Sequence, residues 1–288
     1  MKKLVLQLLT GLLIIGAILV GMKIWFLPRF VYKRNARSAE KVVTSVSSKG
    51  KSEEDIYDTY TFEEASKKFT VDQSLLLVNK DHTIEPDYPA DIVEYKDTGV
   101  LMNSCIIDSY SKLSKAVMDT TGDKLYVMSS YRSYEDQQRV LEEEGPEIAA
   151  LPGTSEHQTG LALDVYISEF AGAGFIQCDA GIFVNDHCYD YGFIIRYPYG
   201  GEDITGFEYE PWHIRYVGLP HSKIIEESGC LFEDYAELYE VGKYSEYDGY
   251  LIGRMPKDEI KIPKDSKDVV LSEDGLGYVF VTVKTEAK

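Results

Sequence analysis

Two of the five histidines in this sequence stand near carboxylates at spacings that suit a catalytic metal ion. His157 and Asp164 share the segment SEHQTGLALD, and His213 follows Glu210 in the segment YEPWH. Two imidazoles and one carboxylate leave the fourth position of a tetrahedral zinc ion open for water, as a catalytic zinc site requires. A further carboxylate beside such a site suits a general base that passes the proton of that water to a leaving amine. These residue types therefore indicate metal-assisted hydrolysis.

Short strands and the loops that enter them must position these side chains. Asp164 lies in LALDVYI, whose alternation is typical of a strand, and His157 ends the Gly/Pro/Ser loop PGTSEH. Glu210 and His213 are separated by an odd number of residues, so a regular strand would aim them at opposite faces. Pro211 between them favours a bulge or a strand start, which would remove the conflict.

The surrounding pattern predicts an α+β fold. Apolar residues recur at helical spacing over 105–118, and Ser133 can cap a helix over 134–144. Strands are expected at KLYVMSS, LALDVYI, FIIRY and WHIRYV, with another helix near 184–191. We therefore expect a small, mostly antiparallel sheet with flanking helices around the zinc site.

The ends of the chain predict further parts. Residues 4–22 form an uncharged apolar run that would span roughly 30 Å as a helix, about one bilayer core. We expect 1–33 to be a transmembrane anchor with a basic flank; a cleaved signal peptide is the alternative, although no clean A-x-A-like site follows. Residues 34–70 are predicted as a polar tether, 71–230 as the zinc domain, and 231–288 as short helices and a small β appendage.

Charge is distributed unevenly along the chain, whose 288 residues carry a formal net charge of −18. Residues 1–50 hold nine Lys and Arg against one acid, so the rest of the chain is strongly acidic. An acidic body without a basic stripe argues against nucleic acid as a partner. The basic end suits anionic lipid headgroups, so a lipid bilayer, entered through residues 4–22, is an expected partner.

Four ordered motifs carry a resemblance to a known family: SSYRSYEDQ, PGTSEHQTGLALD, YGFIIRYP and YEPWHIRYVG. Over roughly residues 75–218 the chain resembles the VanY-type D-alanyl-D-alanine carboxypeptidases, a branch of a zinc peptidase group that also includes hedgehog-like domains. The resemblance implies one catalytic Zn²⁺ ion held by His157, Asp164 and His213, with Glu210 as catalytic base.

The resemblance also implies a substrate pocket built around Arg132, with contributions from Gln137 and Ser155. Arg132 would pair with the free carboxylate of the substrate. The residue type agrees with that role, because a guanidinium holds a carboxylate through two parallel charge-assisted hydrogen bonds.

The function implied is that of a membrane-anchored zinc D,D-carboxypeptidase. It would remove the terminal D-Ala from peptidoglycan stem peptides ending in D-Ala-D-Ala, with a role in glycopeptide resistance. An L,D-carboxypeptidase acting on tetrapeptide stems and a non-catalytic wall-binding module are the alternatives. Because the substrate lies outside the cytoplasm, we expect a single-pass cell-membrane protein whose catalytic domain is extracytoplasmic; long domains translocate largely regardless of flanking charge.

The four cysteines form no C-x-x-C pair, so a cysteine-based zinc site is not expected. Outside the cell they could form disulfides, and Cys178 with Cys188 is the first expected pair because these two flank one short excursion. Free thiols are the alternative, and Cys105 and Cys230 complete the set.

Overall fold

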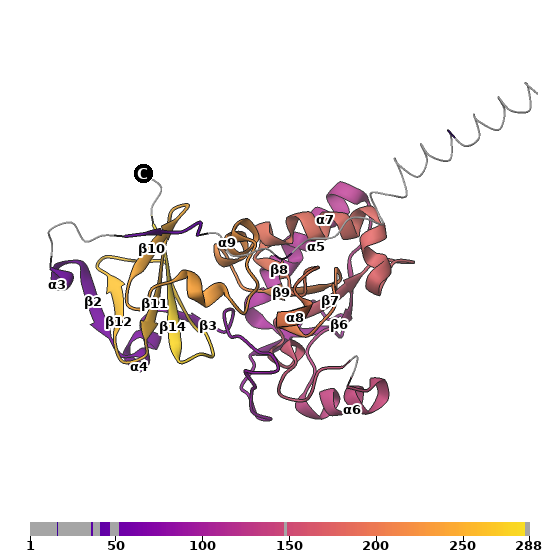
Figure 1. The fold of residues 1–288 in the computed structure, drawn as a ribbon, viewed down its shortest axis with the longest axis horizontal. Coiled ribbons are helices and arrows are strands. Elements are labelled where there is room, and N and C mark those ends of the chain that lie inside the picture. Colours follow the sequence, from indigo (N-terminus) through magenta and orange to yellow (C-terminus); the bar gives the residue numbers. More distant parts are fainter. Residues whose placement is uncertain (1–15, 17–35, 37–40, 47–51, 147–148, 286–288) are drawn as a thin grey trace, which may run out of the picture.

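The fold is described from a computed structural model of the chain (Figure 1), which describes residues 16, 36, 41–46, 52–146 and 149–285. Apart from Gly16, the predicted membrane segment at 4–22 lies outside these residues. In the part of the chain that is described, no helix has the length and apolar character needed to cross a bilayer.

A four-stranded antiparallel sheet lies at the centre of the region predicted as the zinc domain. Its strand order is β6 (Tyr126–Ser129), β7 (Ala162–Tyr166), β9 (His213–Tyr216) and β8 (Phe193–Ile195). The register places Asp164 of β7 opposite Ser129 on one side and His213 on the other. Strand pairing therefore brings two of the predicted metal ligands together from distant segments of the chain.

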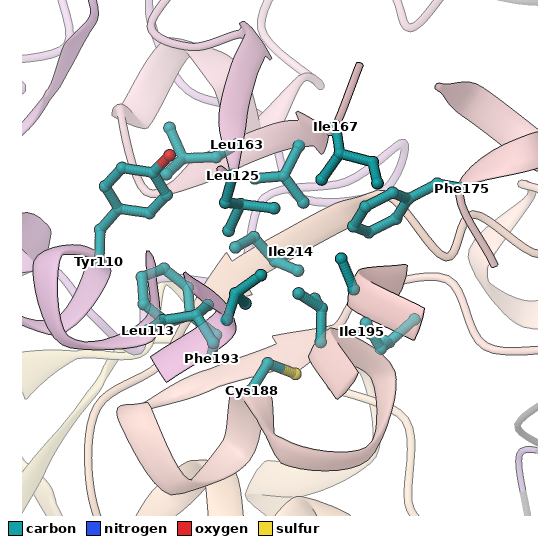
Figure 2. Packing of buried hydrophobic residues seen from close by; sticks show 14 of the residues in the cluster. Tyr110, Leu113, Leu125, Leu163, Ile167, Phe175, Cys188, Phe193, Ile195 and Ile214 are labelled. Atoms are coloured by element: carbon teal, nitrogen blue, oxygen red, sulfur yellow. The ribbon is translucent and has the colours of Figure 1, made fainter. Parts of the chain in front are cut away.

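One face of this sheet is apolar and is covered by helices α5 (Ile107–Thr121) and α7 (Asp179–His187). Helix α5 contributes Tyr110 and Leu113, which lie on one helical face and pack with Leu163 and Ile214 of the sheet (Figure 2). Because successive strand residues point to opposite faces, burying Leu163 and Ile214 turns Asp164 and His213 to the other face. The hydrophobic core thus fixes the face on which the polar site forms.

The helix predicted over 134–144 is present as α6 (Tyr134–Glu144). The Ser133 hydroxyl accepts a hydrogen bond from the Asp136 backbone N–H at 3.1 Å, and the Asp136 carboxylate accepts one from the Ser133 N–H at 3.3 Å. This reciprocal capping box satisfies two backbone donors at the start of the helix. The remaining elements of this region are short: β4 (Ile92–Glu94), β5 (Leu101–Asn103), α8 (Glu202–Thr205), α9 (His221–Ser228) and the 3₁₀ helices η2 (Ser104–Ile106), η3 (Glu156–Thr159), η4 (Gly172–Gln177), η5 (Cys188–Tyr191) and η6 (Tyr235–Leu238).

A second, six-stranded sheet forms the appendage. Its order is β1 (Thr44–Ser45), β10 (Tyr244–Tyr247), β11 (Tyr250–Pro256), β14 (Tyr278–Lys284), β13 (Val269–Glu273) and β3 (Thr70–Asp72). Beside it, β12 (Ile260–Pro263) pairs with β2 (Tyr57–Tyr60). The mixed α+β fold is therefore confirmed, and the β strands predicted within 231–288 are present as β10 to β14.

The structure differs from the tether predicted over 34–70. The described part of that segment contributes β1, β2 and β3, together with the short helices α3 (Glu53–Ile56) and α4 (Phe62–Ser66). Each element spans only two to five residues, so no sustained apolar period marks it in the sequence. Single apolar residues, such as Val43 and Ala65, insert into the core clusters of the appendage instead.

None of the four cysteines forms a disulfide, so the predicted Cys178–Cys188 bond is absent. The Cys178 sulfur instead caps helix α7, where it accepts from the Gly181 N–H at 3.3 Å and donates to the Phe175 carbonyl at 3.0 Å. Cys188 is fully buried in the core beneath the sheet (Figure 2). Both sulfurs are thus used in local structure.

Candidate active site

Three side chains predicted as metal ligands meet on the polar face of the central sheet. His157 comes from η3, and Asp164 and His213 come from the paired strands β7 and β9. One ligand atom of each lies within 4.8 Å of the others. The Asp164 carboxylate lies between the two rings, with Oδ2 3.3 Å from His157 Nε2 and Oδ1 3.0 Å from His213 Nδ1.

The donor set of this cluster fits a zinc ion. His157 Nδ1 is 2.9 Å from the Ser130 carbonyl, so that nitrogen carries the proton and leaves the Nε2 lone pair facing Asp164. Asp164 Oδ1 is buried and has no hydrogen-bond partner among the described residues. An unsatisfied carboxylate oxygen beside imidazole nitrogens is what a cation would occupy, and two imidazoles with one carboxylate match catalytic zinc.

Burial and mutual charge set the protonation of the cluster. Burial alone would raise the pKa of Asp164, but His157 and His213 outweigh it and hold that pKa well below its usual range. Burial lowers the pKa of His157. Burial would also lower the pKa of His213, yet the neighbouring carboxylates of Asp164 and Glu156 outweigh it and raise that pKa to about 9. Metal binding here would therefore displace a proton from His213.

Glu210 lies immediately outside the strand that carries His213. Strand β9 begins at His213 and is preceded by a turn at Pro211 and Trp212, so the alternation of side chains along the strand does not apply to Glu210. Its Oε2 is 3.6 Å from His213 Nδ1, and its backbone N–H donates to the Tyr197 carbonyl at 3.0 Å. Burial raises the pKa of Glu210 to about 7, which suits a group that accepts and returns a proton near neutral pH.

Arg132 lies beside Asp164 and lines the same cavity as Glu210. Its Nη2 is 4.0 Å from Asp164 Oδ2, its Nη1 donates to Gln137 Oε1 at 3.0 Å, and its Nε is buried without a partner among the described residues. The Gln137 amide also donates to the Ala150 carbonyl at 2.8 Å. Gln137 is thus fully buried and orients Arg132, while the remaining guanidinium donors are left for a ligand.

A cavity of about 170 Å³ joins these groups. It is lined by every site residue predicted from the sequence, Ser155 included, and also by Tyr197, Phe207, Trp212, Glu144 and Glu156. The aromatic wall was not predicted from the sequence; its Tyr197 ring packs at a tilt against Phe207 and His213, with centroid distances of 4.5 and 4.9 Å. Tyr197 lies in the motif YGFIIRYP and Phe207 lies outside the four motifs, but neither ring was assigned to the site from the sequence, and only the folded geometry identifies them.

The chain is similar in sequence to known carboxypeptidases. Residues 99–219 match the family described as VanY, D-alanyl-D-alanine carboxypeptidase. The putative carboxypeptidase YodJ of Bacillus subtilis (strain 168) is 38% identical over 186 residues, which are 57% of this chain and 67% of that protein. The bifunctional D-Ala-D-Ala dipeptidase and D-Ala-D-Ala carboxypeptidase VanXYC of Enterococcus gallinarum is 34% identical over 56% of this chain and 93% of its own length.

Solved structures are similar as well. The vancomycin resistance D,D-dipeptidase VanXYg, in complex with a D-Ala-D-Ala phosphinate analog, matches 79% of this chain and 98% of its own with a TM-score of 0.61 and 28% identity. A mutant of the D,D-pentapeptidase VanY from a VanB-type resistance cassette, in complex with Zn(II), matches 57% and 98% with a TM-score of 0.51 and 31% identity. The LD-carboxypeptidase LdcB matches 60% and 91% with a TM-score of 0.53 and 34% identity.

Proposed function

The chain belongs to the VanY family of D-alanyl-D-alanine carboxypeptidases and is a zinc carboxypeptidase, and from this premise we propose that it hydrolyses the terminal D-Ala from peptidoglycan stem peptides ending in D-Ala-D-Ala. One observation carries the proposal: a single small cavity contains a metal-binding triad, a carboxyl group with a raised pKa and a partly buried arginine whose Nε is buried without a partner among the described residues. A non-catalytic wall-binding module would not need a proton-transfer group such as Glu210 beside the metal triad.

Arg132 supports recognition of a C-terminal carboxylate. Its guanidinium is held by Gln137 and lies 4.0 Å from a metal ligand, Asp164. A carboxylate paired with Arg132 would place the last peptide bond of a substrate, and no bond farther from the C-terminus, at the metal centre. The small volume of the cavity, about 170 Å³, suits a small terminal residue such as D-Ala.

Glu210 supports the proton transfers of hydrolysis. A zinc ion held by His157, Asp164 and His213 supplies Lewis acidity, which polarises a carbonyl group and lowers the pKa of water. Glu210 accepts a proton from the attacking water and then donates it to the amine of the departing D-Ala as the C–N bond breaks. The aromatic wall places apolar rings beside these reacting groups in the same cavity.

The test is digestion of a stem pentapeptide by the zinc-loaded protein, with free D-Ala measured by mass spectrometry. We expect release of one D-Ala per peptide. Glu210→Gln should lower the rate by about 10²–10⁴-fold while the protein retains its zinc. Failure of the wild-type protein to release D-Ala from any stem peptide would overturn the proposal.

Hydrolysis of tetrapeptide stems is a second candidate function, favoured by the similarity to the LD-carboxypeptidase LdcB. Both activities release a C-terminal D-Ala and differ in the chirality of the residue before it. Turnover of pentapeptide and tetrapeptide by the same preparation separates them. A higher kcat/KM on the tetrapeptide assigns the L,D activity in place of the D,D activity.

Location and physiological role belong to the same proposal. We place the catalytic domain on the outer face of the cell membrane, anchored through residues 4–22, because the substrate is extracytoplasmic. Loss of the terminal D-Ala would remove the end that glycopeptide antibiotics recognise, and so would contribute to resistance.

Two experiments test the location and the role. Protease digestion of intact expressing cells should cleave the domain, and full protection from protease would contradict the placement. Expression of the protein should raise the inhibitory concentration of a glycopeptide.

A further inference from the structure

A buried carboxylate that the proposed mechanism does not use lies behind His213. Glu156 is only 1% exposed, and its Oε2 is 3.7 Å from His213 Nε2. Both atoms are buried, and neither has a hydrogen-bond partner among the described residues. His213 turns its other ring nitrogen, Nδ1, toward Asp164 at 3.0 Å. The imidazole therefore lies between the metal cluster on one side and Glu156 on the other.

Two buried arginines hold Glu156 through its other oxygen. Glu156 Oε1 accepts from Arg196 Nε at 2.7 Å and from Arg215 Nη1 at 3.0 Å. Glu233 binds Arg196 through two further hydrogen bonds, of 3.0 and 2.6 Å. Arg215 Nη2 donates to the carbonyls of residues 74 and 76. With one oxygen fixed in this way, Oε2 is aimed at the imidazole.

Stability does not account for this network. Removing ion pairs from water costs several kcal/mol per ion, and apolar residues of similar volume often serve as well or better. The sequence nevertheless places a carboxylate next to His157 and an arginine two residues after His213, on the same face of β9. The network is thus built into the two segments that supply the histidine ligands.

We propose that Glu156 is a positioning residue for the zinc site, which accepts the Nε2–H of His213 and so fixes the tautomer and ring orientation that present Nδ1 to the metal. The unsatisfied donor and acceptor face each other at 3.7 Å, and a small rotation of the ring would close this distance. Hydrogen bonding of one imidazole nitrogen decides which nitrogen is free to ligate. This inference rests on the metal triad of the proposed function but not on the peptide that is cleaved.

Glu156→Gln is the primary test, because glutamine has the same shape with different donors. The two arginines are hydrogen-bond donors, so they would bind the amide oxygen and turn the NH₂ group toward His213 Nε2. That contact favours a proton on Nδ1, the nitrogen that must ligate. We expect zinc to bind about 10–100-fold more weakly, measured without substrate by competition with a chromophoric chelator.

Glu233→Gln is the matched control. It weakens the same buried network at Arg196, but it does not contact His213. We expect this variant to lose stability and to bind zinc with wild-type affinity. If both variants lose zinc affinity equally, Glu156 acts only through the stability of the network and the proposal is wrong.

Glu156→Asp keeps the inference testable if the glutamine variant does not fold. Aspartate retains the charge that the arginines need, but it withdraws the carboxylate from His213 by one methylene group. The zinc affinity of this variant should also fall. Long-range ¹H–¹⁵N spectra of the zinc-loaded wild type should show the His213 proton on Nε2, and that signal should be altered in the variant. Wild-type zinc affinity and an unaltered spectrum in a folded Glu156→Asp protein would refute the role of Glu156 even if D-Ala release is confirmed.

Discussion

The Asp164 carboxylate is shared between the metal cluster and the group that recognises the substrate. Its Oδ1 faces His213, while its Oδ2 faces both His157 and, at 4.0 Å, the Arg132 guanidinium. A negative charge at this point stabilises the cation on either side of it. Loss of Asp164 would therefore impair zinc binding and the orientation of Arg132 together, whereas changes at Arg132 test recognition alone.

Arg132→Lys separates charge from geometry at this position. Lysine keeps the positive charge, but it lacks the planar fork that binds Gln137 and a carboxylate at the same time. Losing one charge-assisted hydrogen bond costs about 1.5–3 kcal/mol, so kcat/KM on a stem peptide should fall about 10–100-fold. Steady-state kinetics with a zinc assay checks this, and unchanged kinetics at full zinc content would contradict the role of Arg132.

At the level of single residues, the chemical types predicted the metal ligands and Glu210, and the family resemblance added Arg132 with its two pocket neighbours. Each residue predicted for the site, from Arg132 to His213, lines one cavity, although each taken alone also has an ordinary structural interpretation. Glu156 and Tyr197 were not predicted, although Glu156 adjoins a ligand. A glutamate in a loop is ordinarily exposed, and nothing in its neighbours along the sequence signals the two arginines that bury it.

Among the elements, the turn at Gly160 joins η3 to β7 and so sets the position of His157 relative to Asp164. Gly160 has φ +69°, and a β-carbon there would lie 2.7 Å from the Asn103 backbone nitrogen and 2.4 Å from Ile92 Cδ1. The Asn103 N–H in turn donates to the Gly160 carbonyl at 2.8 Å. The backbone on both sides is therefore fixed, and the close approach leaves no room for a side chain.

Gly160→Ala should destabilise the protein and weaken zinc binding in the fraction that remains folded. The left-handed conformation alone costs alanine about 1–2 kcal/mol, and displacement of Asn103 adds to this. Gly122→Ala is a matched control, because Gly122 has φ +79° but nothing within 4 Å of a built β-carbon. Urea unfolding should show the larger loss at Gly160, and only that variant should bind zinc more weakly. Equal losses in the two variants would show that packing at the turn does not matter.

Over the whole molecule, the appendage joins both ends of the described chain. Strands β1 and β3, from the segment predicted as a tether, lie at the two edges of a sheet otherwise made of C-terminal strands. The second core cluster includes Val43 from this segment, Ile194 of β8 and Phe280 of β14, so the appendage shares a core with the catalytic region. Pairing between residues so far apart depends on the fold, which is why local sequence patterns predicted the C-terminal strands and missed the N-terminal ones.

Truncation tests whether the N-terminal strands are needed for the stability of this sheet. Deleting residues 1–40 keeps all the described strands, whereas deleting 1–72 removes β1, β2 and β3 and exposes the edge of β13. Burial of Val43 alone contributes up to about 1.5–3 kcal/mol, so the longer deletion should lower the Tm by roughly 6 °C or more, or cause aggregation. Equal thermal stability of the two proteins would mean that the N-terminal strands are dispensable.

His221 makes the contact between the catalytic region and the appendage sensitive to pH. It begins helix α9 and is fully enclosed, with Nδ1 2.6 Å from the Tyr235 hydroxyl and Nε2 2.8 Å from the Thr282 hydroxyl of β14. Burial lowers the pKa of His221 to about 3 from an ordinary value of 6.5. The folded protein therefore holds this imidazole neutral over a pH range in which the unfolded chain binds a proton.

The sign of the resulting pH dependence follows from linkage. Above pH 6.5 both states are neutral and the His221 contacts are fully stabilising, whereas between pH 6.5 and about 3 only the unfolded state is protonated. At 1.36 kcal/mol per pH unit, the protein at pH 4.5 should be about 2.7 kcal/mol less stable through this residue than it is well above pH 6.5. His221→Gln can keep hydrogen bonds to Tyr235 and Thr282 but does not titrate, so its unfolding free energy should fall by that much less. Urea unfolding of both proteins, stripped of metal by a chelator, measures the difference, and parallel pH curves would exclude His221 as the responsible group.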